Sequence, residues 1–65
     1  MIKKLIGKPV SVGDDRWLLT GETDDGRRVE VIIANAAMET RGFKEPSLAA
    51  ANEVPALSLR IIRGD

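Results

Sequence analysis

Alternation of apolar and polar residues is clearest between residues 16 and 33 of this 65-residue chain. A β-prone run around Trp17 leads into the turn-forming run Asp-Asp-Gly at 24–26, and a second alternating run follows at 28–33. An Asp-Gly pair between two such runs is a strong short-range signal for a β-hairpin. The pattern therefore predicts a central antiparallel hairpin over about residues 16–33.

Two further segments alternate on either side of this hairpin. Residues 10–12 predict a short strand, and the apolar residues at every second position from Leu57 to Ile61 predict a closing strand over about 57–62. A C-terminal helix remains an alternative for the closing segment, because Leu57, Ile61 and Ile62 also fall on one helical stripe.

Two short helices are expected between the hairpin and the closing strand. The first is predicted over about 36–41, since Asn35 can accept a hydrogen bond from the free backbone N–H groups at its start. Gly42 can adopt the left-handed conformation that ends a helix, and this stop brings Phe43 back towards Met38.

Pro46 prevents the first helix from continuing into the next segment. Ser47 can cap a second helix, predicted over about 48–53 from its strong helix formers. Leu48 and Ala51 are expected to face the core.

This order of elements predicts an α+β fold with a small antiparallel sheet of three to four strands and both helices on one face. The length allows a single domain, residues 1–65, whose last residues, Gly64 and Asp65, are expected to fray. Trp17 is predicted to pack in the core, because one large aromatic side chain supplies much of the burial in so small a domain.

Three apolar residues exceed what one sheet face needs: Leu18, Ile32 and Ile62 alternate onto the face opposite their apolar neighbours. If they cluster, they form a patch that a stable monomer rarely leaves open, and a protein partner or a second copy of the chain would cover it. The alternative is that the helices cover part of this face. An edge strand, at 10–12 or 57–61, could also pair with a partner's strand.

The sequence lacks His and Cys, which supply most metal ligands, the usual general base and the thiol nucleophile. A Cys/His zinc site, a Ser-His-Asp triad, a Cys nucleophile and disulfides are therefore excluded. We expect a protein that is not an enzyme and carries no cofactor. The absence of Cys is compatible with a cytoplasmic protein.

Paired carboxylates occur only at 14–15 and 24–25. In the predicted hairpin these pairs lie at opposite ends of one strand, about 25 Å apart, so they cannot share a metal ion. Both are interpreted as turn residues, because Asp tolerates turn geometry and hydrogen-bonds its own backbone. No glycine-rich phosphate-binding spacing is present.

Nucleic-acid binding is the alternative function, and it would use Lys3, Lys4, Lys8, Arg27 and Arg28 on one surface. The chain has ten Lys plus Arg against ten Asp plus Glu, a formal net charge of zero. Phosphate binding usually comes with a basic domain and aromatic residues for stacking, whereas aromatics are scarce here. Nucleic acid is therefore a less favoured partner.

The first residues, Met1 to Ile6, combine positive charge with apolar side chains, but Gly7 ends the apolar run before it reaches the length of a signal-peptide core. No window approaches 18 consecutive apolar residues. We expect a cytoplasmic protein without a membrane interaction.

The Trp-containing strand, the Asp-Asp-Gly turn, the run Val29–Ile33 and the following Asn35–Met38 together resemble short bacterial proteins of unknown function, a family of the structural-genomics type. The resemblance covers about residues 16–39. It implies a bacterial origin and no assigned activity, so no site residue is transferred from it.

The sequence thus favours a small non-catalytic binding module that engages a protein partner, or itself, through a sheet face or edge. Leu18, Ile32 and Ile62 are the candidate contact residues.

Overall fold

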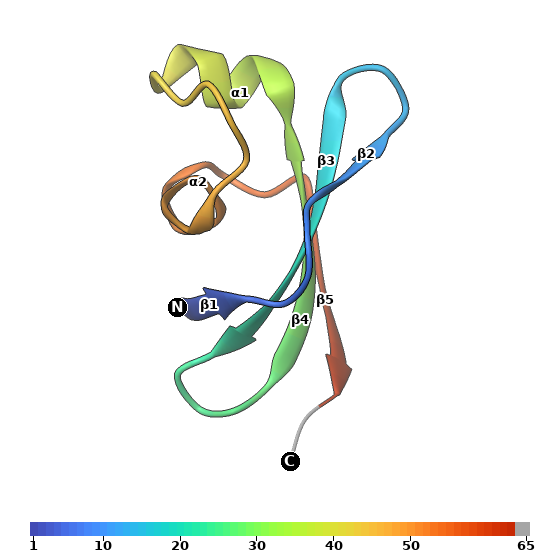
Figure 1. The fold of residues 1–65 in the computed structure, drawn as a ribbon, viewed down its shortest axis with the longest axis vertical. Coiled ribbons are helices and arrows are strands. Elements are labelled where there is room, and N and C mark those ends of the chain that lie inside the picture. The colour runs from blue at the N-terminus through green and yellow to red at the C-terminus, as the bar shows by residue number, and fades with distance from the viewer. Residues whose placement is uncertain (64–65) are drawn as a thin grey trace.

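The computed structural model describes residues 1–63 and contains a five-stranded antiparallel sheet with two short helices (Figure 1). The strand order is β1-β3-β4-β5, and β2 pairs with the free part of β3 beside β1. The predicted α+β class is confirmed, with more strands than expected. The strands are β1 (Ile2–Leu5), β2 (Val10–Val12), β3 (Arg16–Thr23), β4 (Arg28–Ala34) and β5 (Ser58–Arg63), and the helices are α1 (Asn35–Thr40) and α2 (Leu48–Glu53).

The predicted central hairpin is formed by β3 and β4, which pair from Arg16 opposite Ala34 to Glu22 opposite Arg28. Its turn depends on Gly26, whose φ of 85° is in the left-handed region. The Gly26 N–H donates to the Thr23 carbonyl at 3.0 Å, and the sheet ladder resumes directly beyond the turn. The Asp-Gly turn prediction is therefore confirmed.

Strand β1 was not predicted, because a bulge hides its alternation. Ile2 lies opposite Thr23 and Leu5 lies opposite Gly21, with a register shift between Ile2 and Lys4. Residues three apart would face opposite sides of a regular strand. The bulge lets both apolar residues face the core: Ile2 is buried and Leu5 packs against the buried cluster.

Gly21 allows β1 to lie close against β3. A Cβ atom at this buried position would be 2.6 Å from Ile2 Cγ2 and 3.1 Å from the Lys4 carbonyl oxygen. Both distances are shorter than ordinary van der Waals contacts, so any side chain here forces β1 outward.

Asn52 of α2 fixes β1 from its other side. Its Oδ1 accepts a hydrogen bond from the Ile2 N–H at 2.9 Å, and its Nδ2 donates to the Ile2 carbonyl at 2.8 Å. The side-chain amide thus takes the place that the backbone of a neighbouring strand would occupy.

Helix α1 begins one residue earlier than predicted, and the expected Asn35 cap was wrong. Ala34 is the N-cap, with no side-chain cap hydrogen bond, and Asn35 is the first helical residue. The physical reason is the adjoining sheet: Asn35 N–H donates to the Asp15 carbonyl at 2.7 Å, which continues the β-type pairing up to the helix start. The Asn35 amide instead donates to Glu39 Oε1 at 3.2 Å.

The predicted glycine stop of α1 is confirmed, although the helix ends one residue earlier than predicted, at Thr40. Gly42 has a φ of 84°, its N–H donates to the Glu39 carbonyl, and the Phe43 N–H donates to the Met38 carbonyl at 2.9 Å. Phe43 then packs against the buried cluster that contains Met38.

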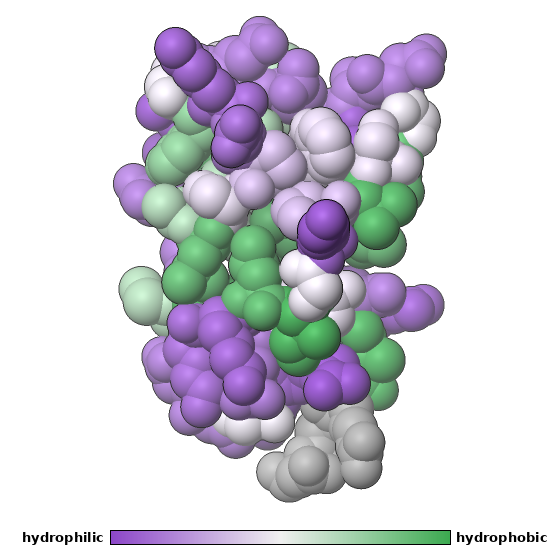
Figure 2. Space-filling view, in the orientation of Figure 1, coloured by the Kyte–Doolittle hydropathy of each residue, from purple (hydrophilic) through white to green (hydrophobic). Residues whose placement is uncertain are grey.

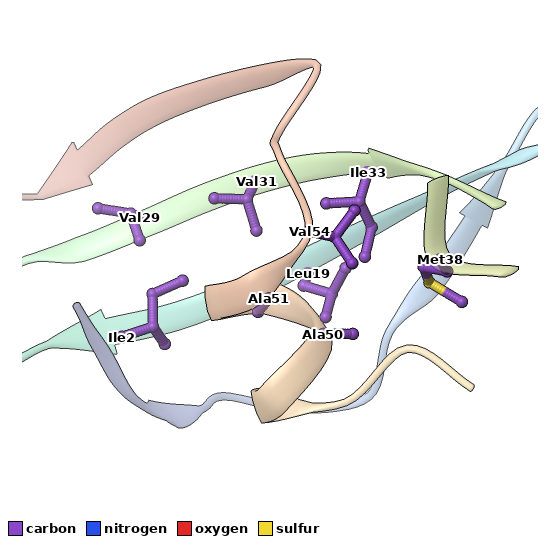
Figure 3. Packing of buried hydrophobic residues seen from close by; sticks show 9 residues of the cluster. All are labelled: Ile2, Leu19, Val29, Val31, Ile33, Met38, Ala50, Ala51 and Val54. Atoms are coloured by element: carbon purple, nitrogen blue, oxygen red, sulfur yellow. The ribbon is translucent and has the colours of Figure 1, made fainter. Parts of the chain in front are cut away.

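Helix α2 has the predicted bounds and the predicted cap, in which Ser47 Oγ accepts from the Ala50 N–H at 3.2 Å. The expectation that Leu48 faces the core was wrong, because Leu48 is exposed and the buried positions are Ala50 and Ala51. These small side chains let α2 lie close to the sheet, as Figure 3 shows.

The core lies between the helices and one face of the sheet, which we call the helix face (Figures 1 and 3). Trp17 is partly buried and packs against this core. The buried residues come from β1, β3, β4, both helices and the residue after α2: Ile2, Leu19, Val29, Val31, Ile33, Met38, Ala50, Ala51 and Val54.

The closing segment is a strand, so the helical alternative was wrong. β5 pairs antiparallel with β4, from Ile32 opposite Ser58 to Arg28 opposite Arg63. The strand begins and ends one residue later than predicted. The prediction for Gly64 and Asp65 lies outside the described residues.

Replacing Asn52 with Ala should lower the free energy of unfolding by about 1–2 kcal/mol, since it removes both hydrogen bonds to Ile2. Urea denaturation measures the change. Asn35→Ala is the matched control, because that amide bonds only within its own exposed helix turn, and it should change stability by less than about 0.5 kcal/mol. Equal losses in both variants would contradict the role of Asn52.

Gly21→Ala should destabilise the protein by about 1–3 kcal/mol through overpacking against Ile2. Chemical denaturation of Gly21→Ala, Ile2→Ala and the double variant forms the test. The double variant should lose less stability than the two single losses added together, because Ile2→Ala removes the clashing methyl group. Strict additivity would show that the clash is not with Ile2.

Candidate functional site

An exposed row of apolar side chains runs along β5 and includes the residue before it; we call Leu57, Leu59 and Ile61 the β5 row. Their exposed fractions are 56%, 60% and 50%. Leu59 lies opposite Val31 and Ile61 opposite Val29, both of which are buried in the core. Because opposed residues of antiparallel strands share a face, Leu59 and Ile61 continue the core layer beyond the cover of the helices.

A hollow of about 270 Å³ adjoins the β5 row on the helix face. Met1, Val54, Ala56 and Leu59 contribute to its mainly apolar lining. Met1 is 84% exposed, so this hollow has an apolar side chain at the protein surface. Figure 2 shows apolar side chains gathered across the middle of the molecule, with hydrophilic ones at both ends.

The sheet face opposite the helices, which we call the open face, carries two of the three predicted contact residues together. Leu18 of β3 lies directly opposite Ile32 of β4, and both are half-buried. They line a shallow hollow of about 360 Å³ together with Ser58 and Arg60 of β5 and with Glu30. Both helices pack on the other face, so they do not cover this pair.

Ile62 does not join this pair. Ile32 lies opposite Ser58, which is four residues, or about 13 Å of strand, before Ile62. The ion pair between Arg60 and Glu30, at 2.8 Å, lies between them on the open face. Ile62 is 45% exposed at the register shift near the end of β5, so the three residues do not form one continuous patch.

Three of the five predicted basic residues gather around one acidic residue. Lys4 and Arg28 both lie opposite Glu22 in the sheet register, and Lys3 makes an ion pair with Glu22 at 3.2 Å. The carboxylate partly neutralises this group, which weakens its attraction for phosphates.

Of the other two basic residues, Arg27 precedes Arg28 of this group in the chain, and Lys8 follows β1. Lys8 is in the connection between β1 and β2, and Arg27 is in the β3–β4 turn, where it pairs with Asp25 at 3.3 Å. The five basic residues are thus not all grouped around Glu22.

The two carboxylate pairs lie in the turns at opposite ends of β3, one before Arg16 and one after Thr23. Among residues 1–63, no three acidic side chains lie close enough together to hold a metal ion. The Thr23 hydroxyl donates a hydrogen bond to Asp25, and this bond, helped by nearby Arg27, lowers the pKa of the Asp25 carboxyl. This carboxylate stabilises its own turn.

Residues 57–61 were predicted as an edge strand that could pair with a partner, but Leu57, Leu59 and Ile61 were not singled out as contact residues and their exposure was not predicted. The sequence contained a signal for this exposure. The two predicted helices have about six residues each, which is too short to cover a whole face of the predicted sheet of three to four strands.

Comparison of the chain with protein-family models, with curated proteins and with solved structures found no match. Among the described residues, neither helix has the length and apolar character needed to cross a membrane.

Asp25→Asn should reduce stability at neutral pH and have a smaller effect as the pH falls. The folded-state pKa of Asp25 is lowered, so its contribution is present above the unfolded-state pKa and is lost as the pH falls through the folded-state pKa. Denaturation at neutral and acidic pH tests this, with Asp24→Asn as the control turn variant. A difference from the parent that does not vary with pH would contradict the assignment.

Proposed function

We propose that the chain is a small non-catalytic module that binds a protein partner, or another copy of itself, through the free edge of β5. The observation that carries this proposal is the β5 row, whose side chains leave half or more of their surface exposed on a strand at the end of the sheet order. An unpaired strand offers backbone hydrogen-bonding groups, and its alternate side chains supply specificity.

Burial of the β5 row would supply useful binding energy. Full burial of a Leu or Ile side chain contributes about 1.5–3 kcal/mol, so completing the burial of each half-exposed member adds roughly 1 kcal/mol. Backbone pairing along the strand would add directional contacts to this term. The β5 row can therefore act as the apolar centre of an interface.

Leu18 and Ile32 support the proposal as a second contact region. Their hollow on the open face is bordered by Ser58 and Arg60, and the hollow on the helix face is bordered by Leu59. All three bordering residues belong to β5. A partner strand beside β5 would therefore reach both hollows.

Nucleic-acid binding has less support. The basic group around Glu22 is partly neutralised, and the chain is neutral overall. Its expected signature is binding that weakens steeply as the salt concentration rises.

The test compares the parent chain with Leu59→Arg and with Leu48→Arg, a control at an exposed apolar position on α2. Capture from host lysate, with and without nuclease, and sedimentation at increasing concentration are measured for each chain. We expect a nuclease-resistant partner or self-association that Leu59→Arg abolishes and Leu48→Arg retains.

Binding that survives Leu59→Arg would contradict the proposal. Recovery of only those partners that nuclease removes would favour the nucleic-acid alternative instead.

A further inference from the structure

The two edges of the sheet are protected very differently. On the β1–β2 edge, β1 carries Lys3 and Lys4 at its bulge. The connection that contains Lys8 and Pro9 then interrupts the edge. Asn52 also occupies the Ile2 N–H and carbonyl. Lysines, proline, bulges and covering groups are the devices by which natural sheets block pairing with another chain.

β5 has few such devices. Between Ser58 and Ile62 its only charged residue is Arg60, and that charge is already paired with Glu30 at 2.8 Å. No proline interrupts the strand, and its register shift with β4 lies at its C-terminal end, beyond the β5 row. The β1 edge is thus closed to strand addition, β2 beside it offers only three residues, and the β5 edge is open.

We propose that the occupant of this edge is a second copy of the chain, paired antiparallel through β5 about a twofold axis at Leu59. This inference rests on the function proposed above and specifies its partner. The axis is perpendicular to the sheet, so the helix faces of both copies lie on the same side. The two five-stranded sheets then form one continuous sheet.

The order of residues in β5 fits this register. Leu59 lies opposite its counterpart and Leu57 lies opposite Ile61, so the two apolar rows meet on the helix face. On the open face Ser58 lies opposite Arg60, and its hydroxyl can accept a hydrogen bond from the guanidinium group. No unpaired charge is buried at the seam, because Arg60 retains Glu30 as its partner.

Neighbouring registers fit less well. An axis at Arg60 would place two arginines opposite each other, and like charges directly opposed destabilise a strand pair. An axis at Ile61 would leave Leu57 outside the paired segment, and an axis at Ser58 would leave Ile61 outside it. The axis at Leu59 thus brings all three residues of the β5 row to the seam.

The surface of the chain is sufficient for such a dimer. A standard interface removes about 800 Å² from each partner, which is less than a fifth of the 4408 Å² that this chain exposes. A single edge strand and its flanking hollows form a small interface, so a dissociation constant of about 1–100 μM is expected.

Disulfide trapping tests the register directly, because the parent chain has no Cys and each substitution introduces a single thiol. Leu59→Cys brings its thiol opposite the thiol of the second copy, where directly opposed antiparallel residues have Cα atoms about 4.5–5.5 Å apart, within disulfide reach. Ile61→Cys is the register control, because its two thiols would lie about 13 Å apart along the strands. Val10→Cys is the control for the other edge and is similarly exposed.

We expect Leu59→Cys to form a covalent dimer under mild oxidation at least about tenfold faster than either control, and Leu59→Arg to weaken dimerisation about a hundredfold by opposing two charges. Circular dichroism verifies that each variant is folded. Equal cross-linking of all three variants, faster cross-linking of Ile61→Cys, or a parent chain that sediments as a monomer at millimolar concentration would overturn the inference.

The two proposals fail in different ways. A monomeric parent that captures another protein through Leu59 would overturn the dimer and leave the proposed function standing. A monomeric parent whose captured proteins are unaffected by Leu59→Arg would overturn both.

Discussion

The two short helices cover only part of one sheet face, and this limit decides which apolar side chains of the sheet are buried. Each helix has six residues, and their buried side chains are Met38, Ala50 and Ala51. This cover is enough for Leu19, Val31 and their neighbours on the central strands. It ends before β5, where the apolar layer continues on the same face without protection. Longer helices would bury the β5 row in the core. The proposed interface therefore depends on the helices being short.

The N-terminal edge is closed by several local features that depend on each other. Gly21 leaves space for Ile2, the bulge at Lys3 and Lys4 turns Ile2 and Leu5 to the same side, and Asn52 holds the Ile2 backbone. The first two features join β1 to β3, and Asn52 joins β1 to α2. Because β1 is closed and β2 has only three residues, strand pairing with another chain is favoured at β5.

Local sequence signals were sufficient for the hairpin, for the glycine stop of α1 and for the Ser47 cap, because each depends on residues close together in the chain. They failed where distant segments decide the result. β1 depends on a bulge in its pairing with β3. Asn35 is the first residue of α1 rather than its cap, because its N–H donates to the Asp15 carbonyl and extends the sheet pairing to this position. The separation of Ile62 from Leu18 and Ile32 depends on the β4–β5 register, and the exposure of the β5 row depends on how far the helices extend.

The most direct test of the open edge is amide hydrogen exchange of the parent chain, resolved by residue and repeated across a range of protein concentrations. The account predicts that protection increases with concentration for the amides of β5 on its unpaired side, while the amides of Lys3 and Lys4 on the closed edge do not change. Protection of β5 that is independent of concentration, or an increase confined to the β1–β2 edge, would contradict it.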